Sequence, residues 1–532
     1  MAGNVRIRLL AVAALVLLSA PAGAQETGSD VKPVVTNAVQ VTTNPNPTRA
    51  HSSPQIARNP KTGELVIVET DVYGGFGVSV HISGDEGRTW APGGDPMMKP
   101  YTWNSDYAIN GPYVTSVFDK NGVLFLAFTA ADPATAALNR AERPRPLFVA
   151  RSDDSGRGFT TTMAYAVTES DAKTINNRRG RIALDPKNSA NVHVGWIQSS
   201  TGAKARSMTA ASTDGGRTFG PAIDLAEAEP QGGYDPRMAV TPDGIVHAVT
   251  PGGGFAPAPP AGTPAADPLV RPLSYRQSRD QGKTWSPPVV IDQGSAGFAH
   301  NRKQTLVADP GSGNLYLAWY GNAKTRPGLE DDNEILLRVS RDSGQTWEER
   351  VVVNDDAASP NTQHYNPGVS IAPNGRVDIA WYDFRNSPAP EIQANAAPFN
   401  NGGMTDVYYA SSADGGRTFS KNVRISDRSA DRRIGVWSNN VHSHFTVGIT
   451  SSNDGVYMAW QDSRNGNSIT NSEDVYFASL LLDAPGVSVE DQGGVPGWVL
   501  AGAGVAGGMG LAMLLVFLIG RRSRPEVATA RG

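Results

Sequence analysis

Apolar segments recur along the chain, and each follows a tight turn. A turn rich in Asn, Asp, Gly and Pro runs directly into a mostly apolar segment seven times. Apolar runs of this length between turn residues are typical of buried β-strands. The pattern predicts seven strands, at Glu64–Glu69, Val123–Thr129, Val192–Ile197, Ile245–Val249, Leu315–Tyr320, Arg376–Tyr382 and Val456–Gln461.

A second element follows each of these strands. The chain passes through a loop of variable length into another strand that ends near a Ser. Six of these strands run into the pattern Ser-x-Asp-x-Gly-x-x-aromatic, whose aspartates are Asp85, Asp154, Asp214, Asp280, Asp342 and Asp414. An Asp side chain accepts backbone N–H bonds in its own turn, and Gly adopts a positive φ without steric cost. Six copies predict structural hairpins rather than six active sites.

The two patterns together predict an all-β fold. Each unit contains four antiparallel strands, the unit of a β-propeller, and the chain contains seven units. The last unit, near Asp474–Leu480, has no Ser–Asp hairpin and so lacks a fourth strand. Asn37–Thr43 resembles the fourth strands Val351–Asp355 and Asn422–Ser426. We expect Asn37–Thr43 to close the ring as the outer strand of the last blade, because closure removes exposed strand edges.

The segments outside the repeats predict export and a membrane anchor. The N-terminus has arginines, an apolar run and a small-x-small cleavage site, as signal peptides do. An uncharged C-terminal segment is long enough, at ~1.5 Å per residue, to cross a ~30 Å hydrocarbon core as a transmembrane helix. Arginines follow it, which places the tail in the cytoplasm and the propeller outside the cell. The expected divisions are a signal peptide (1–24), a short lead (25–35), the propeller (36–483), a linker (484–497), a transmembrane helix (498–520) and a cytoplasmic tail (521–532).

Composition and charge exclude several classes of function. The chain has 47 Lys and Arg against 51 Asp and Glu, a net charge of −4, which gives no basic face for nucleic acid. It has no Cys, which excludes disulfides, thiolate metal sites and cysteine nucleophiles. No pattern indicates an oligomer.

The order of strands fixes which loops share an end of the propeller. The Ser–Asp hairpins and the turns between first and second strands lie at one end, which we call the hairpin end. The loops between second and third strands and the crossings between blades lie at the other, which we call the loop end. The longest loops fall at the loop end, within residues 250–272, 321–333 and 383–405. Since variable loops on a rigid scaffold usually carry function, we expect the site at the loop end, near the central axis.

Polar residues gather where the chain enters the blades at the loop end. These segments are His51-Ser52, Asn177–Arg181, Tyr234–Arg237, His300–Arg302, His364–Asn366 and His442–His444. Five of the eight histidines lie in them. Two interpretations stay open: a solvated rim whose histidines bond to nearby backbone, or a floor that binds an anion or a sugar.

Two blades share a further motif at the same end. WYDFRN and WQDSRN contain Asp383, Arg385, Asp462 and Arg464, and each motif is followed by Asp-Val-Tyr. The repetition favours local ion pairs that fix the loop, although an aromatic beside a carboxylate and an arginine also suits sugar binding. The acidic run Glu330–Glu334 lacks the glycine and spacing of a calcium loop, so we predict no cofactor and no metal, with Ca²⁺ the only candidate.

The six hairpins resemble the Asp-box repeats of the bacterial sialidase superfamily, over roughly residues 50–480. Family sialidases have six blades, whereas this chain predicts seven. The resemblance implies three arginines that hold the substrate carboxylate, a Tyr–Glu nucleophile pair and an Asp acid/base. In the family the first arginine belongs to a Phe/Tyr-Arg-Ile-Pro motif, and Ser52 of His51–Pro54 stands in its place here.

By this resemblance, Arg237 and Arg302 are candidates to hold a carboxylate, Tyr365 is the candidate nucleophile and Asp71 the candidate acid. His364 joins the Asp and Arg residues of the two repeated motifs as a candidate substrate contact. Two functions follow. One is a propeller that binds a carbohydrate or another cell-surface ligand; the other is an exo-acting glycoside hydrolase. The Ser at position 52 favours binding.

Overall fold

The computed structural model describes thirteen segments of the chain, which are residues 34–71, 77–101, 114–130, 145–167, 175–200, 204–229, 232–252, 272–293, 304–321, 333–356, 363–387, 403–435 and 446–482. The expected signal peptide, linker, transmembrane helix and tail lie outside these residues. Within the described segments no helix is long and apolar enough to cross a membrane.

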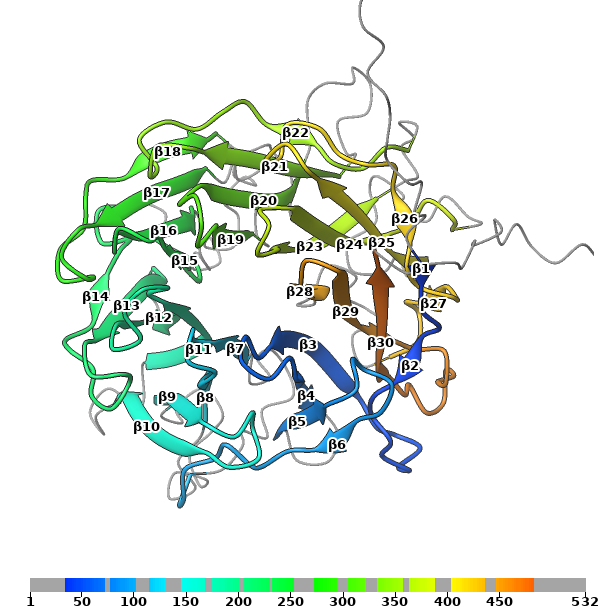
Figure 1. The fold of residues 1–532 in the computed structure, drawn as a ribbon. Helices are drawn as coiled ribbons and strands as arrows, with labels where there is room; N and C mark the ends of the chain where they lie inside the picture. Colours follow the sequence, from blue (N-terminus) through cyan, green and yellow to red (C-terminus); the bar gives the residue numbers. More distant parts are fainter. Residues whose placement is uncertain are drawn as a thin grey trace, which may run out of the picture. The chain divides into compact units, whose positions relative to one another are not determined.

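The described residues form seven antiparallel sheets, which we call blades 1 to 7, around a common centre (Figure 1). The innermost strands of blades 1 to 7 are β3 (His51–Arg58), β7 (Thr115–Phe118), β11 (Ile175–Leu184), β15 (Arg237–Val240), β19 (Thr305–Ala308), β23 (His364–Ile371) and β28 (Gly448–Ser451). The second strands are β4 (Leu65–Asp71), β8 (Leu124–Thr129), β12 (Val192–Ser200), β16 (Val246–Pro251), β20 (Leu315–Gly321), β24 (Val377–Asp383) and β29 (Gly455–Asp462).

The outer half of each blade follows the same order. The third strands are β5 (Gly77–Ser83), β9 (Leu147–Ser152), β13 (Arg206–Ser212), β17 (Leu273–Ser278), β21 (Glu334–Ser340), β25 (Met404–Ser412) and β30 (Asp474–Leu481). The fourth strands of blades 1 to 6 are β6 (Ala91–Pro92), β10 (Thr160–Tyr165), β14 (Ile223–Asp224), β18 (Val289–Asp292), β22 (Val351–Val352) and β26 (Val423–Arg424). A short extra strand, β27 (Ala430–Asp431), pairs with β25.

The blades form a closed ring. Each innermost strand contacts the innermost strands of both neighbouring blades, and β28 contacts β3. The sequence prediction of an all-β propeller with seven blades is confirmed.

The N-terminal segment supplies the fourth strand of blade 7, as the sequence predicted. β2 (Val39–Gln40) pairs with Tyr476–Phe477 of β30, and the Val41 amide donates to the Val475 carbonyl at 2.8 Å. β1 (Val34–Val35) pairs with Leu480–Leu481, so the pairing begins slightly before the expected segment.

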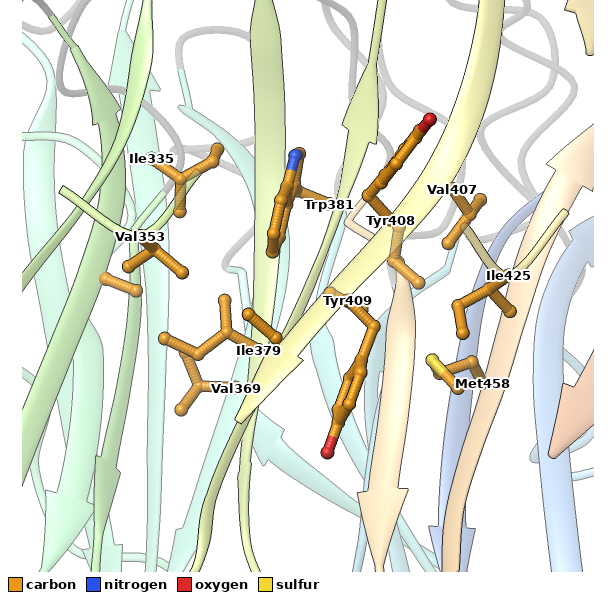
Figure 2. Close-up of a cluster of buried hydrophobic side chains, with 14 of the residues drawn as sticks. Ile335, Val353, Val369, Ile379, Trp381, Val407, Tyr408, Tyr409, Ile425 and Met458 are labelled. Carbon is orange, nitrogen blue, oxygen red and sulfur yellow. The ribbon is translucent and has the colours of Figure 1, made fainter. Parts of the chain in front are cut away.

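Aromatic side chains of the second strands fill the space between blades. Trp196, Trp319, Trp381 and Trp460 are each at most 1% exposed. Figure 2 shows Trp381 between Ile335 of blade 5 and Tyr408 of blade 6, its partner on the neighbouring strand. Burying aromatic groups of this size contributes several kcal/mol in total and fixes the spacing of neighbouring blades.

The six Ser–Asp hairpins share one set of bonds within their own turns, as expected for structural hairpins. In each, the Ser hydroxyl donates to Asp Oδ1 at 2.6–2.9 Å. The same hydroxyl accepts the amide of the hairpin Gly at 2.7–2.8 Å. Each of these glycines has a positive φ, which the turn requires. All six hairpins join third and fourth strands and therefore lie at the hairpin end.

Candidate functional site

The candidate residues of blades 1, 6 and 7 lie at the loop end, where second strands finish. His51 pairs with Asp71 in blade 1, and His364 pairs with Asp383 in blade 6. Asp462 pairs with Asp474 in blade 7. The antiparallel register thus places polar side chains at one end of the ring.

Three innermost strands carry a bulge just inside the loop end. The register shifts between Ser52 and Gln55, between Arg178 and Arg181, and between Tyr365 and Gly368. Each bulge contains one non-glycine residue with positive φ, namely Ser53, Arg179 and Asn366. A positive φ at a non-glycine residue costs about 1–3 kcal/mol, and such residues are concentrated at functional sites. A bulge also changes the direction in which a side chain points.

A cluster of arginines surrounds one carboxylate between blades 3 and 4. Asp235 is fully buried and its Oδ2 lies 2.7 Å from Arg181 Nη2 and 3.4 Å from Arg237 Nη2. Its Oδ1 lies 3.7 Å from Arg179 Nη1. The Arg179 guanidinium also stacks 4.7 Å from the Tyr234 ring centroid and donates to the Tyr234 hydroxyl. Three cations therefore share one anion.

The contacts within this cluster shift the pKa of the carboxylate and the pKa of one arginine. Burial opposes ionisation of Asp235, but Arg237 and Arg181 outweigh it and hold the pKa of the carboxyl well below its usual range. Burial and the charge of Arg181 lower the pKa of Arg237 to about 9. Sequence analysis named Arg237 as a site residue, but it left Arg179 and Arg181 in a polar segment without assigning them to a site.

Blade 6 fixes its second-to-third loop through Asp383. The Trp381 indole donates to Asp383 Oδ2 at 2.8 Å, and Arg385 Nε and Nη2 donate to the same oxygen at 3.0 and 2.8 Å. The Arg385 guanidinium stacks 4.1 Å from the ring centroid of Tyr408.

Blade 7 repeats these contacts atom for atom. The Trp460 indole donates to Asp462 Oδ2 at 3.2 Å, and Arg464 Nε and Nη2 donate to it at 2.9 and 2.7 Å. Arg464 stacks 4.0 Å from the ring centroid of Tyr476. The predicted local ion pairs are present in both blades, and the repetition indicates a structural role for them.

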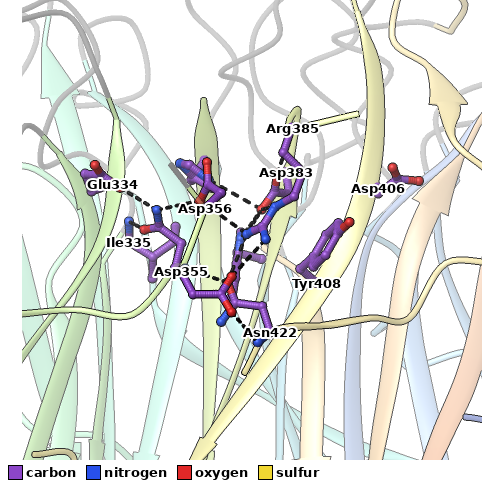
Figure 3. Close-up of polar contacts among 12 residues, drawn as sticks. Glu334, Ile335, Asp355, Asp356, Asp383, Arg385, Asp406, Tyr408 and Asn422 are labelled. Carbon is purple, nitrogen blue, oxygen red and sulfur yellow. Dashed lines mark hydrogen bonds and ion pairs between the residues drawn. The ribbon is translucent and has the colours of Figure 1, made fainter. Parts of the chain in front are cut away.

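Blade 6 adds two groups to this arrangement (Figure 3). His364 Nδ1 lies 2.7 Å from the Asn333 carbonyl, and its Nε2 lies 3.0 Å from Asp356 Oδ1 and 3.4 Å from Asp383 Oδ2. Burial opposes a charged imidazole, but the two carboxylates outweigh burial and raise the pKa of His364 to about 9. Sequence analysis named His364 but missed Asp356, which lies in the crossing from blade 5.

Tyr365, the candidate nucleophile, lies inside the protein. It is 3% exposed, and its ring packs edge-on against Tyr320 and Phe384. Its hydroxyl donates to Gln363 Oε1 at 3.2 Å and accepts from Asn333 Nδ2 at 3.3 Å. The catalytic role of Tyr365 stays a prediction.

Asp71, the candidate acid, is half-buried at the end of β4. It belongs to blade 1 and Tyr365 to blade 6, and β28 of blade 7 contacts the innermost strands of both. Its catalytic role also stays a prediction. Ser52 is 2% exposed and lies in the bulge of β3.

Several candidates fall outside the described residues. They are Arg302 with the rest of His300–Arg302, the segment His442–His444 and residues 330–332 of the acidic run. The two described residues of that run, Asn333 and Glu334, bond to Gln363 and Asn354, respectively.

Comparisons with known proteins give structural similarities alone. The sequence matches no protein-family model and no curated protein. A Hadza microbial sialidase is 14% identical with a TM-score of 0.41, over 80% of this chain and 75% of that one. The phage phi92 endosialidase is 12% identical with a TM-score of 0.42, over 86% and 71%. An α-L-arabinofuranosidase of Fusarium graminearum is 14% identical with a TM-score of 0.39, over 65% and 92%.

These similarities are too low to support any conclusion about activity or substrate. The assignment of the fold rests on the sequence repeats and the β-sheets of this chain. It has seven four-stranded blades, an N-terminal strand that closes the ring, and six Ser–Asp hairpins with a common set of bonds. The protein is a seven-bladed β-propeller that resembles the Asp-box sialidase superfamily.

Proposed function

We propose that this protein binds an acidic glycan, or another carboxylate- or sulfate-bearing group of a cell surface, at the loop end. The observation that carries the proposal is the sharing of Asp235 by Arg179, Arg181 and Arg237. Three guanidinium groups around one carboxylate favour the approach of a further anion.

The geometry suits an anion with two or more oxygens. Guanidinium groups bind carboxylate and sulfate oxygens through paired, charge-assisted hydrogen bonds. Asp235 holds the Arg181 side chain by two bonds, at 2.7 and 3.1 Å, so part of the cost of ordering that arginine is met before a ligand arrives. Arg237 Nε is buried and makes no hydrogen bond with the described part of the chain.

Binding is the favoured function, and exo-acting glycoside hydrolysis is the second candidate. Ser52 occupies the family arginine position, and the Tyr365 hydroxyl bonds to two amide side chains. Hydrolysis stays a candidate because Asp71 places a half-buried carboxylate at the loop end.

The setting of the binding site is part of the proposal. We propose that residues 1–24 direct export, that residues 498–520 anchor the chain in the cell membrane, and that the propeller lies outside. Protease added to intact cells is expected to cut within residues 484–497, release the propeller and leave residues 521–532 protected. A tail that is cut from outside would contradict this orientation.

A glycan array tests the binding function. The purified protein is expected to retain uronate, sialylated or sulfated glycans over neutral ones, and Arg237→Gln is expected to lose that preference. The control is Arg376→Gln, because Arg376 is a partly buried arginine, paired with Asp378 at 2.8 Å, but lies at the hairpin end. Equal binding by both variants would reject the arginine cluster as the site.

A further inference from the structure

We propose that His364, Asp356 and Asp383 form a binding site for a divalent transition-metal ion. The three residues come from different segments: Asp356 from the crossing between blades 5 and 6, His364 from the start of β23, and Asp383 from the end of β24. One donor atom of each lies within 4.8 Å of the others.

The first argument is the direction of the His364 ring. Nδ1 lies 2.7 Å from a backbone carbonyl, which only accepts, so Nδ1 carries the hydrogen. In a neutral ring, Nε2 then presents a lone pair toward two carboxylates. The residue is 1% exposed, and the contacts of Nε2 are the carboxylate oxygens of Asp356 and Asp383. A lone pair that faces two anions in a buried site is unfavourable, so either a proton on Nε2 or a metal ion bound to it lies between them.

The distances agree with coordination of an ion. His364 Nε2 lies 3.0 Å from Asp356 Oδ1 and 3.4 Å from Asp383 Oδ2. Ligands that sit about 2.1 Å from one ion are separated by roughly 3.0–3.4 Å in octahedral or tetrahedral geometry. The Nδ1 bond to a carbonyl is also the outer contact that metal-binding histidines usually make.

The local charge favours a divalent ion over a single proton. Asp355, Asp356 and Asp383 share one cation, Arg385, whose nitrogens lie 3.0, 3.3 and 2.8 Å from their respective carboxylate oxygens. The Glu334 carboxylate joins them through Asn354, which donates to both Glu334 and Asp356. Four carboxylates against one guanidinium leave a charge of −3, which a divalent ion reduces further than a proton does.

Comparison with blade 7 shows which side chains of blade 6 the repeated loop structure does not need. The Asp–Arg pair and the stacked Tyr occur in both blades, and Asp427 contacts Arg464 at 2.7 Å much as Asp355 contacts Arg385. The next residue is Asp356 in blade 6 but Arg428 in blade 7. The repeated loop structure therefore forms without Asp356, and this carboxylate serves something else.

The donor set indicates the class of ion. One imidazole nitrogen with carboxylate oxygens suits Zn²⁺ or Mn²⁺, whereas Ca²⁺ and Mg²⁺ prefer oxygen alone. Trp381 and Arg385, which donate to Asp383 Oδ2, would be outer groups that orient this ligand.

Calorimetric titration of the EDTA-treated full chain in detergent with ZnCl₂ and MnCl₂ tests the proposal. We expect one ion per chain and a rise in melting temperature. His364→Ala and Asp356→Asn are each expected to weaken binding by about 100-fold or more. Asp427→Asn is the control, because Asp427 is the blade 7 equivalent of Asp355 and lies outside the proposed site, and this variant is expected to bind as the wild type does.

Further readouts keep the test decisive. Co²⁺ bound through His364 is expected to give visible d–d absorption that Asp356→Asn abolishes. This variant decides the matter if His364→Ala fails to fold, because Asp356 lies nearer the surface. The proposal is overturned if no ion binds, because a proton would then be the occupant of the site. It is also overturned if Ca²⁺ binds more tightly than Zn²⁺. A third contrary result would be that Asp427→Asn weakens binding as much as Asp356→Asn does.

Discussion

The Arg49 guanidinium forms a two-pronged ion pair with Asp474, which lies 425 positions later in the chain. Arg49 Nε and Nη2 each lie 2.6 Å from one oxygen of the carboxylate. The Thr42 hydroxyl donates to Asp474 Oδ1 at 3.1 Å, and the His51 amide donates to the Glu473 carbonyl at 3.0 Å. The segment that closes the ring is therefore held by charge as well as by strand pairing.

Loss of this ion pair is expected to weaken ring closure. Arg49→Gln leaves the fully buried Asp474 without its main cation, which typically costs about 3–5 kcal/mol. Urea unfolding measures the change. Arg433→Gln is the control, because the Arg433 side chain is 65% exposed in its pair with Asp431 and should cost at most about 1 kcal/mol. Equal losses in the two variants would show that the Arg49 pair has no special role.

The Ser–Asp hairpins are expected to affect stability and not ligand binding. Asp342 accepts the Ser340 hydroxyl at 2.9 Å and the Thr346 amide at 2.8 Å. Asp342→Ala should lower the free energy of unfolding by about 1–3 kcal/mol, because these donors lose their acceptor. Asp153→Ala changes an exposed, variable hairpin position and should stay within about 0.5 kcal/mol. A loss of ligand affinity in folded Asp342→Ala would contradict the assignment.

The buried pair His51–Glu69 predicts a dependence of stability on pH. Burial opposes the charged imidazole, but Glu69, 2.9 Å away, outweighs it, with help from Asp71 and Asp474, and raises the pKa of His51 to about 9. A raised pKa stabilises the fold fully below the unfolded value of about 6.5, and the effect is lost as the pH rises through 9. The free energy of unfolding should therefore fall by up to about 3 kcal/mol between pH 6.5 and 10.

Urea unfolding across this pH range checks the prediction with two variants. His51→Gln should remove about half of the decline, because His364, whose pKa is also raised to about 9, contributes a similar share. His193→Gln should keep it, because burial lowers the pKa of His193 to about 4 and this side chain is already neutral at pH 6.5. A decline of unchanged size in His51→Gln would show that His51 does not contribute to it.

Hydrolysis of sialosides is expected to be weak or absent. Ser52 offers one neutral donor where the family places a guanidinium, and losing one charged partner typically costs about 2–5 kcal/mol of binding. The assay is release of a fluorogenic leaving group from a sialoside by the purified protein. Robust turnover that Tyr365→Phe abolishes would restore the hydrolase and reject the binding function.

The repeated parts of this structure were predictable because short local signals specify them. Ser, Asp and Gly make their hairpin bonds within a few residues, so six hairpins and seven blades follow from the sequence. The outer strand of blade 7 was predictable for a related reason, since Asn37–Thr43 resembles strands elsewhere in the chain.

The candidate sites depend on contacts between distant segments, and the sequence shows these less directly. Arg181 and Asp235 are 54 positions apart, and the positive φ of Arg179 arises from a bulge that only pairing reveals. Asp356 belongs to a crossing whose approach to His364 is set by the packing of blades 5 and 6. The polar residues at the blade entrances indicated the region of the candidate sites, but they did not indicate which side chains contact one another there.

The affinity for one acidic sugar and its neutral ester tests the central claim most directly. Calorimetry would compare the best acidic glycan with the same glycan methylated at its carboxylate. We expect the ester to bind about 2–5 kcal/mol more weakly to the wild type, since it loses charge-assisted bonds to the arginine cluster, and we expect Arg237→Gln to bind acid and ester almost equally. Equal affinity of the wild type for acid and ester would contradict the proposed anion site.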